Sequence, residues 1–142
     1  MNIILLKQSD IDVFWSYIYR ILTNALIKSR WIERYPIDSL LDDLENGVLQ
    51  CWIVSDERDI HGVAITQELE YPLGNSLMVF LLSGDRMSEW YKELNIKLVE
   101  HAKKNNIKWI DACAREGLGK KYLAEIGYKN HANHYVLGVN NG

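Results

Sequence analysis

The sequence predicts an α/β domain, α+β in some classifications, built on a mixed central sheet. Segments in which apolar residues recur with helical spacing alternate with strand-like segments, in the order β-α-α-β-β-β-α-β-α-β. A short polar turn joins two of the strands into an antiparallel hairpin. A buried strand, a long helix and a further strand form a β-α-β unit, whose two strands run parallel.

Composition limits the class of protein. The chain has 142 residues, close to one typical domain, and it is 48% hydrophobic and 25% charged, which excludes a mainly disordered chain. Its formal net charge is −3, so no bulk positive field would attract nucleic acid. We therefore expect one domain over residues 1–142 and no nucleic-acid partner.

The cysteines and the N-terminus favour a cytoplasmic protein. Cys51 and Cys113 are far apart and lack a Cys-x-x-Cys spacing, so we expect two buried thiols in a reducing compartment. The apolar run at residues 3–6 is too short for a signal-peptide core or a membrane span. We expect no membrane partner.

The N-terminal part is predicted to form a strand and two helices. Residues 2–7 are a short apolar run, and Ser9 followed by Asp12 resembles a capping box that starts a helix. That helix extends to about Ser29. Its apolar residues recur at intervals of three and four: Ile11, Phe14, Trp15, Ile18, Ile21, Leu22, Ala25 and Leu26. A shorter, acidic helix follows Pro36.

Three strands are predicted next. Residues 50–55 and 61–71 form a hairpin around the polar turn at 56–59. Residues 76–82 are almost continuously apolar, as in a strand buried on both faces. We therefore expect this third strand at the centre of the sheet.

The C-terminal part begins with the strongest helical stripe in the chain. The stripe consists of Met87, Trp90, Tyr91, Leu94, Leu98 and Ala102. A strand over 107–114, a short helix over 117–126 and a final strand over 128–139 follow. Gly127 is in the position at which glycine commonly ends a helix.

This order, over essentially the whole chain, resembles the fold of the GNAT N-acetyltransferases. Residues 101–110 resemble the GNAT segment that joins the cofactor-binding helix to the next strand. Residues 123–128, Leu-Ala-Glu-Ile-Gly-Tyr, resemble the family's helix that ends in a Gly-aromatic pair. Residues 114–118 are similar to a segment of small GNAT-like proteins encoded by tailed phages.

The resemblance implies a binding site for acetyl-CoA. The cofactor would lie between the strand that ends near Leu82 and the strand that begins near Ile107, with its pantetheine paired to strand backbone. Its pyrophosphate would be held by N–H groups at the start of the third helix, where the helix dipole favours an anion. The implied cofactor-binding residues are Leu81, Leu82, Ser83, Gly84, Arg86, Met87 and Ser88.

The sequence departs from the family at the pyrophosphate loop. GNAT loops carry Gln/Arg-x-x-Gly-x-Gly/Ala, because glycines let the backbone approach phosphate. Arg86 aligns with the basic position, but Glu89 and Tyr91 stand where small residues are expected. Two interpretations remain open. A shifted loop still binds the cofactor, or the site has lost it because a carboxylate repels pyrophosphate.

Candidate catalytic residues follow from the same resemblance. A GNAT reaction needs a base for the amine and often a tyrosine that protonates the thiolate. Tyr122 is the candidate acid, although it lies one residue further from Gly127 than the family's tyrosine does, which also fits a core residue. Glu68 and Glu70 are candidate bases, since they project from one face of a strand; the alternative is two solvated charges.

The histidines give no expected metal site. His131 and His134 would point to opposite faces of a strand. We interpret His61 as a turn residue and His101 as a residue of the helix end. We expect no metal.

The aromatic residues fall into two groups. Trp15 and Trp90 lie on apolar helical faces, which indicates core packing. Trp31 and Tyr35 lie in the connection between the first two helices, where GNAT proteins build the acceptor side of their groove. They would suit a substrate pocket or a protein interface.

The predicted function is transfer of an acetyl group from acetyl-CoA to an amine of a small molecule or a protein by direct attack. The alternative is a catalytically inactive GNAT-fold protein, of phage origin by the weaker resemblance, that binds or assembles through protein contacts. Both are compatible with a homodimer.

Overall fold

The computed structural model describes residues 1–114, 119–132 and 134–139. In these ranges the chain forms a five-stranded sheet in the order β1-β2-β3-β4-β5. The strands are β1 (Asn2–Leu5), β2 (Gln50–Ser55), β3 (Ile60–Tyr71), β4 (Gly74–Gly84) and β5 (Ile107–Ala112). Neighbours from β1 to β4 pair antiparallel, and β4 pairs parallel with β5. The predicted mixed sheet is confirmed.

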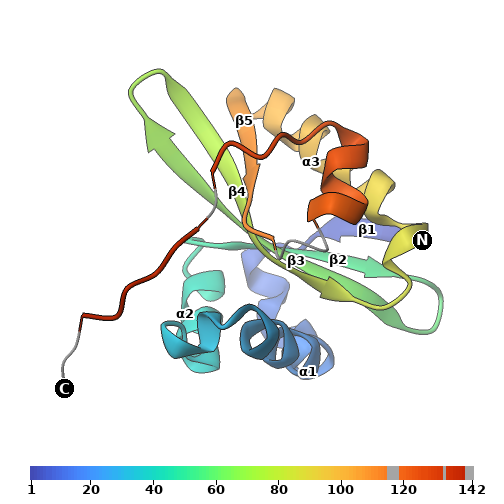
Figure 1. The fold of residues 1–142 in the computed structure, drawn as a ribbon. Helices are drawn as coiled ribbons and strands as arrows, with labels where there is room; N and C mark the ends of the chain where they lie inside the picture. The colour runs from blue at the N-terminus through green and yellow to red at the C-terminus, as the bar shows by residue number, and fades with distance from the viewer. Residues whose placement is uncertain (115–118, 133, 140–142) are drawn as a thin grey trace.

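Helices cover both faces of the sheet. They are α1 (Ile11–Ser29), α2 (Ile37–Glu45) and α3 (Tyr91–Lys104), with short turns η1 (Gln8–Asp10), η2 (Trp31–Glu33), η3 (Met87–Glu89), η4 (Gly119–Leu123) and η5 (Ala124–Ile126). Figure 1 shows α1 and α2 on one face and α3 with the η4–η5 segment on the other. Of the helices within the described ranges, none combines the length and apolarity needed to cross a membrane.

A separate apolar core fills each side of the sheet. The α1–α2 side buries residues such as Ile18, Leu22, Leu40 and Ile65, none more than 1% exposed. The α3 side is centred on Trp90, which is fully buried against β-strand residues and α3. Trp90 is thus a core residue as predicted. Trp15 is only half-buried and makes an edge contact with Tyr19.

Two predicted helix starts are wrong. Ser9 lies inside the turn η1, and α1 begins at Ile11 without a side-chain cap from Asp10, so there is no capping box. The third helix was predicted to begin at Met87, one turn too early. Met87–Glu89 is a 3₁₀ turn, and α3 starts at Tyr91. Arg86 precedes that turn with a φ of 53°, and this left-handed residue separates the turn from β4.

The final strand and the centre of the sheet also differ from expectation. No described residue of 128–139 is in a strand, and Tyr135 and Leu137 are each 86% exposed. Figure 1 shows residues 134–139 extending away from the sheet on the side of α2. A strand needs a neighbour for its backbone hydrogen bonds, and β propensity alone supplies none. Consequently β3, not β4, is the middle strand.

Candidate functional site

The strands β4 and β5 stop pairing halfway along β4. Their register runs from Asn75–Ile107 to Val79–Ala112, and the N–H of Cys113 donates to the carbonyl of Val79 at 3.1 Å. The pairing of β4 with β3 continues to Gly84. The last part of β4 therefore has a backbone edge that no described residue of β5 occupies, at the position where the resemblance implies acetyl-CoA.

A β-bulge lies at the same point of β4. The register with β3 changes from Ile65–Leu81 to Thr66–Val79, so Phe80 has no partner. Both Phe80 and Leu81 pack into the core on the α1–α2 side, whereas strict alternation would separate them. A bulge of this kind bends the strand and redirects side chains.

Aromatic residues from the connection between α1 and α2 pack on this bulge. The ring of Trp31 meets Phe80 edge-on with centroids 5.9 Å apart, and Tyr35 stacks on Phe80 at 6.0 Å. The hydroxyl of Tyr35 donates to Asp43 of α2, and His134 contacts Trp31 at 6.2 Å. The residues predicted for the acceptor side are thus gathered at the point where β4 and β5 separate.

A largely apolar pocket lies on the opposite side of the bulge, between β4, α3 and η4. Its cavity volume is about 30 Å³, room for about one or two water molecules. The residues that line it are Val79, Leu82, Tyr91, Leu94, Asn95, Leu98, Ala112, Cys113, Ala114, Tyr122, Leu123, Ile126 and Tyr128. Of the sequence-predicted site residues, Leu82 and Tyr122 are in this set.

Tyr122 and Tyr91 connect η4 with the start of α3. Their ring centroids are 4.7 Å apart. The hydroxyl of Tyr91 donates to Glu125 at 2.6 Å, and Lys92 approaches the same carboxylate at 3.2 Å. The hydrogen bond to Glu125 raises the pKa of Tyr91, and the two donors lower the pKa of Glu125. Its hydrogen bond to Glu125, 34 residues further along the chain, therefore directs the Tyr91 side chain toward the η4–η5 segment.

The turn between β4 and α3 is built around Gly84. Its φ is 152°, and a Cβ there would lie 2.0 Å from the carbonyl oxygen of His61. After it, Arg86 forms an ion pair with Glu89, so the carboxylate that departs from the family pattern has a cation beside it. Met87 and Ser88, which the resemblance assigns to the cofactor, begin η3, a 3₁₀ turn of three residues, and their role in binding stays a prediction.

His61 is the residue that sequence reasoning misinterpreted. It lies in β3, not in a turn, and its side chain is 8% exposed. Its Nε2 lies 2.6 Å from Asp56 in the β2–β3 turn, and its Nδ1 lies 2.8 Å from Asp85 beside Gly84. The acidic turn at 56–59 next to a histidine was an available signal. The partnership with Asp85 depends on the register that pairs Gly62 with Gly84.

Glu68 and Glu70 lie away from this region. Glu68 pairs in register with Leu77 and accepts a hydrogen bond from Asn75 at 3.0 Å, and Glu70 is opposite Asn75. Both are exposed and neither lines the pocket. At ~3.3 Å per residue, the three residues from Leu77 to Phe80 correspond to about 10 Å along the strand.

The cysteines differ from each other. Cys51 is buried, and burial raises the pKa of its thiol to about 12. Cys113 is exposed, so the expectation of two buried thiols is wrong for it. It is exposed because it follows directly after β5, where no described strand covers the sheet edge. Partial removal of the thiol from water by its neighbours, together with the nearby Asp111, raises the pKa of Cys113.

Solved structures with the same arrangement include known acetyltransferases. A ribosomal-protein-alanine N-acetyltransferase from Brucella melitensis biovar Abortus superimposes with a TM-score of 0.71 and 17% identity, over 97% of this chain and 99% of that one. A predicted acetyltransferase with acetyl-CoA from Clostridium acetobutylicum has a TM-score of 0.70 and 21% identity, over 97% and 96%.

An aminoglycoside acetyltransferase from an uncultured soil sample, in complex with sisomicin, has a TM-score of 0.66 and 15% identity, over 99% of this chain and 95% of that one. No protein-family model and no curated protein sequence matches the chain. At these identities the likeness is one of fold: the chain has the GNAT fold, as its sequence predicted. The resemblance to phage proteins involves residues 115–118, outside the described ranges, and stays a prediction.

Proposed function

We propose that this protein transfers an acetyl group from acetyl-CoA to an amine. The observation that carries the proposal is the end of β4–β5 pairing at Val79, next to the bulge at Phe80, with aromatic residues on one side and an apolar pocket on the other. Acetyl-CoA supplies the thioester: a C–N bond forms between the amine and the carbonyl carbon, the C–S bond breaks, and the proton that the nitrogen loses balances the one that the CoA thiolate gains. A similar structure from Clostridium is described with acetyl-CoA, which supports this choice of cofactor.

The residues of the turn and of β4 fit such a cofactor. Gly84 carries no Cβ where the two backbones meet, and the N–H groups of Met87 and Ser88 begin a helical turn. Backbone groups of Leu81, Leu82 and Ser83 belong to the part of β4 beyond its pairing with β5. Arg86 offsets the charge of Glu89, which favours the interpretation that the altered loop still binds.

On the acceptor side, the half-buried rings of Trp31 and Tyr35 pack on the buried Phe80, and the carboxylate of Asp43 accepts from Tyr35. Ring faces and a nearby carboxylate attract an ammonium group, which supports an amine acceptor, either a small molecule or a protein. We assign this side to the acceptor. Glu68 and Glu70 lie about 10 Å along the sheet, so geometry does not favour them as bases.

Tyr122 is the proposed acid for the departing thiolate. It lines the pocket together with Leu82 and Cys113, on the side of β4 that faces α3. Tyr122 lies one residue further from Gly127 than the family's tyrosine. Because η4 is a π-helical turn, with more residues per turn than an α-helix, this extra residue does not exclude Tyr122 as the acid.

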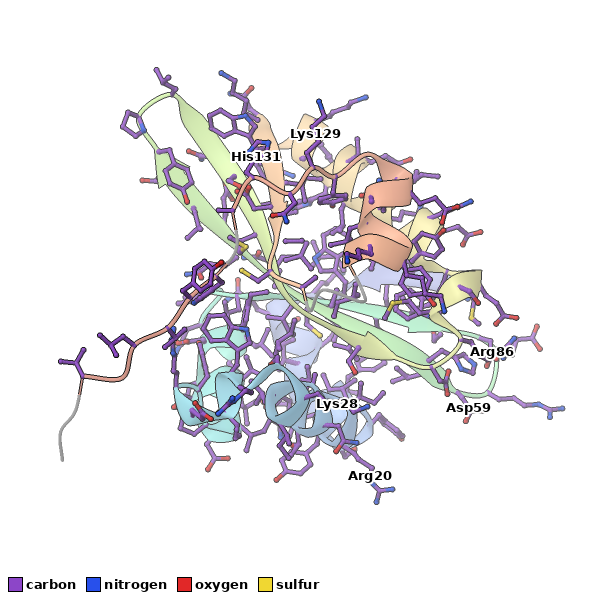
Figure 2. All side chains as sticks on the ribbon, viewed as in Figure 1. Arg20, Lys28, Asp59, Arg86, Lys129 and His131 are labelled. Carbon is purple, nitrogen blue, oxygen red and sulfur yellow. The ribbon has the colours of Figure 1, made fainter. Side chains whose placement is uncertain are left out.

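Calorimetric titration with acetyl-CoA and CoA tests the proposal. We expect micromolar binding that weakens at least tenfold in Arg86→Ala, because Glu89 then lacks its cation near the pyrophosphate. Arg20→Ala is the matched control, since Arg20 is exposed on α1, away from Arg86 (Figure 2).

No binding at millimolar cofactor would overturn the proposal and favour the catalytically inactive alternative. If binding is found, release of the CoA thiol with a panel of small amines and of peptides with free amino groups identifies the acceptor class.

A further inference from the structure

The buried ring of His61 joins two loops at one end of the sheet. Its nitrogens lie 2.6 Å from Asp56, in the β2–β3 turn, and 2.8 Å from Asp85, in the β4–α3 turn. Figure 2 shows Arg86 and Asp59, which belong to these two turns, at that same end. The β4–α3 turn is the proposed pyrophosphate site, so His61 lies directly behind it.

The geometry selects the protonated imidazole. A carboxylate can only accept hydrogen bonds, and a histidine has two N–H donors only when it carries a positive charge. Asp56 stays ionised because its other oxygen accepts the N–H groups of Arg58 and Asp59, both at 2.8 Å. These backbone donors, with His61, lower the pKa of Asp56. The bonds to Asp56 and Asp85 raise the pKa of His61, while burial opposes the rise.

The backbone of His61 holds the same turn. The N–H of Asp85 donates to the carbonyl of His61 at 2.8 Å, and the indole of Trp90 donates to the carbonyl of Asp85 at 2.8 Å. Gly62 packs so closely against Trp90 that a Cβ would lie 2.5 Å from the ring. Both the main chain and the side chain of Asp85 are therefore fixed from β3.

The charges around His61 come from every loop that packs against it. Asp56 and Asp59 lie in the β2–β3 turn, where ligand-type atoms of these two residues and His61 are all within 4.8 Å of one another. Asp85 and Arg86 lie in the β4–α3 turn, and Arg86 is 3.9 Å from Asp56. When His61 loses its proton, one ring nitrogen can no longer donate, and the formal charge of the three carboxylates, Arg86 and His61 together falls from −1 to −2, which disfavours an anion further.

We propose that His61 is a proton-controlled positioning residue, whose charged ring holds Asp85 and the β4–α3 turn in the form that receives the cofactor's pyrophosphate. The inference rests on the proposed function, since the ligand of the turn is that cofactor. Binding is strongest while His61 is protonated. It weakens as the pH rises through the raised pKa of His61, above the ordinary value of 6.5.

A titration of the histidine ring nitrogens by NMR tests the protonation state without cofactor. The His61 signal is identified by its loss in His61→Asn. We expect a pKa above 6.5 in the full chain and a lower pKa in Asp85→Asn, a variant that spares the core because Asp85 is 71% exposed. A pKa at or below 6.5, or no change in Asp85→Asn, would overturn the inference.

The dependence of cofactor affinity on pH, between about pH 6 and 8.5, tests whether the charge on His61 controls binding. Dephospho-CoA is the probe, because its pyrophosphate does not titrate in this range. We expect the dissociation constant to rise by up to about tenfold per pH unit above the His61 transition. The rise should be flattened in His61→Asn and begin at lower pH in Asp85→Asn. His131→Asn, an exposed histidine elsewhere on the molecule, should behave as wild type (Figure 2).

The outcomes separate the two hypotheses. Binding that does not change with pH in the wild type refutes the role of His61 and leaves the proposed function intact. Absence of binding of both dephospho-CoA and CoA at every pH overturns both. Loss of the His61 titration on addition of Zn²⁺ at stoichiometric concentration would assign the cluster of Asp56, Asp59 and His61 to a metal ion and overturn the inference.

Discussion

Replacing Gly84 by alanine should damage both the stability of the protein and the proposed cofactor site. A Cβ at this position would lie 2.0 Å from the carbonyl oxygen of His61 and 2.6 Å from the Cα of Gly62. Real Cβ atoms essentially never approach closer than 3.0 Å, so the end of β4 must move by about 1 Å away from β3. That displacement also breaks the hydrogen bond from Asp85 to His61.

The size of the effect follows from two contributions. A residue with a side chain at a φ of 152° costs on the order of 1–3 kcal/mol in backbone strain. The lost hydrogen bond adds roughly 1 kcal/mol. For 142 residues, an unfolding entropy of about 0.3 kcal/mol/K converts a total of roughly 2–4 kcal/mol into a fall in Tm of roughly 7–13 °C.

The measurement is thermal unfolding followed by circular dichroism, together with titration of CoA at a temperature where the variant is folded. Gly138→Ala is the matched control, because a Cβ there meets nothing within 4 Å. We expect the control to bind and melt like the wild type, and Gly84→Ala to bind at least tenfold more weakly. A Gly84→Ala protein within 2 °C of the wild type in Tm (~0.6 kcal/mol) would refute the steric reasoning.

Three further perturbations have defined outcomes. Thr66→Val should lower the free energy of unfolding, measured by urea denaturation, by about 1–3 kcal/mol. The indole of Trp52 donates to the buried hydroxyl of Thr66, which donates to Gln50, both at 3.0 Å. Thr66→Ser keeps the hydroxyl and should recover most of the loss, and equal losses in the two variants would contradict this account. Tyr122→Phe should lower kcat by about 10²-fold or more with little change in KM if Tyr122 protonates the thiolate, whereas an unchanged kcat would remove that role. Asp56→Asn should destabilise the protein at neutral pH, because the pKa of Asp56 is lower in the folded protein than its unfolded value of 3.8. The stability that this carboxylate adds is present above pH 3.8 and is lost as the pH falls through the folded pKa. A stability difference between the two proteins that stays constant as the pH falls below 3.8, in unfolding measured against pH, would disprove the coupling.

The elements up to β5 were predictable because each one carries its own local pattern. The stripe of α1, the hairpin of β2 and β3, and the parallel pair around α3 follow from periodicity and turn chemistry within each segment. The strand expected over 128–139 failed for the opposite reason. Its residues have β propensity, but a strand forms only with a partner, which local sequence does not specify.

The candidate site was predictable in outline and not in detail. The position of the implied cofactor turn, between Gly84 and Ser88, followed from the end of a strand and the start of a helix. The bulge at Phe80 did not, because the change in register exists only between two paired strands. The sequence did not show that Tyr91 donates to Glu125, 34 residues away, or that Arg86 pairs with Glu89.

By itself, the sequence determined the order of the elements up to β5, their amphipathic faces and the β-α-β unit, since each depends on residues near one another in the chain. Only the tertiary structure decided that His61 lies between Asp56 and Asp85, and that Trp31 and Tyr35 pack on Phe80. These are contacts between elements, and register, bulges and burial determine them together. They also determine which side chains carry charge, because protonation depends on partners and on removal from water.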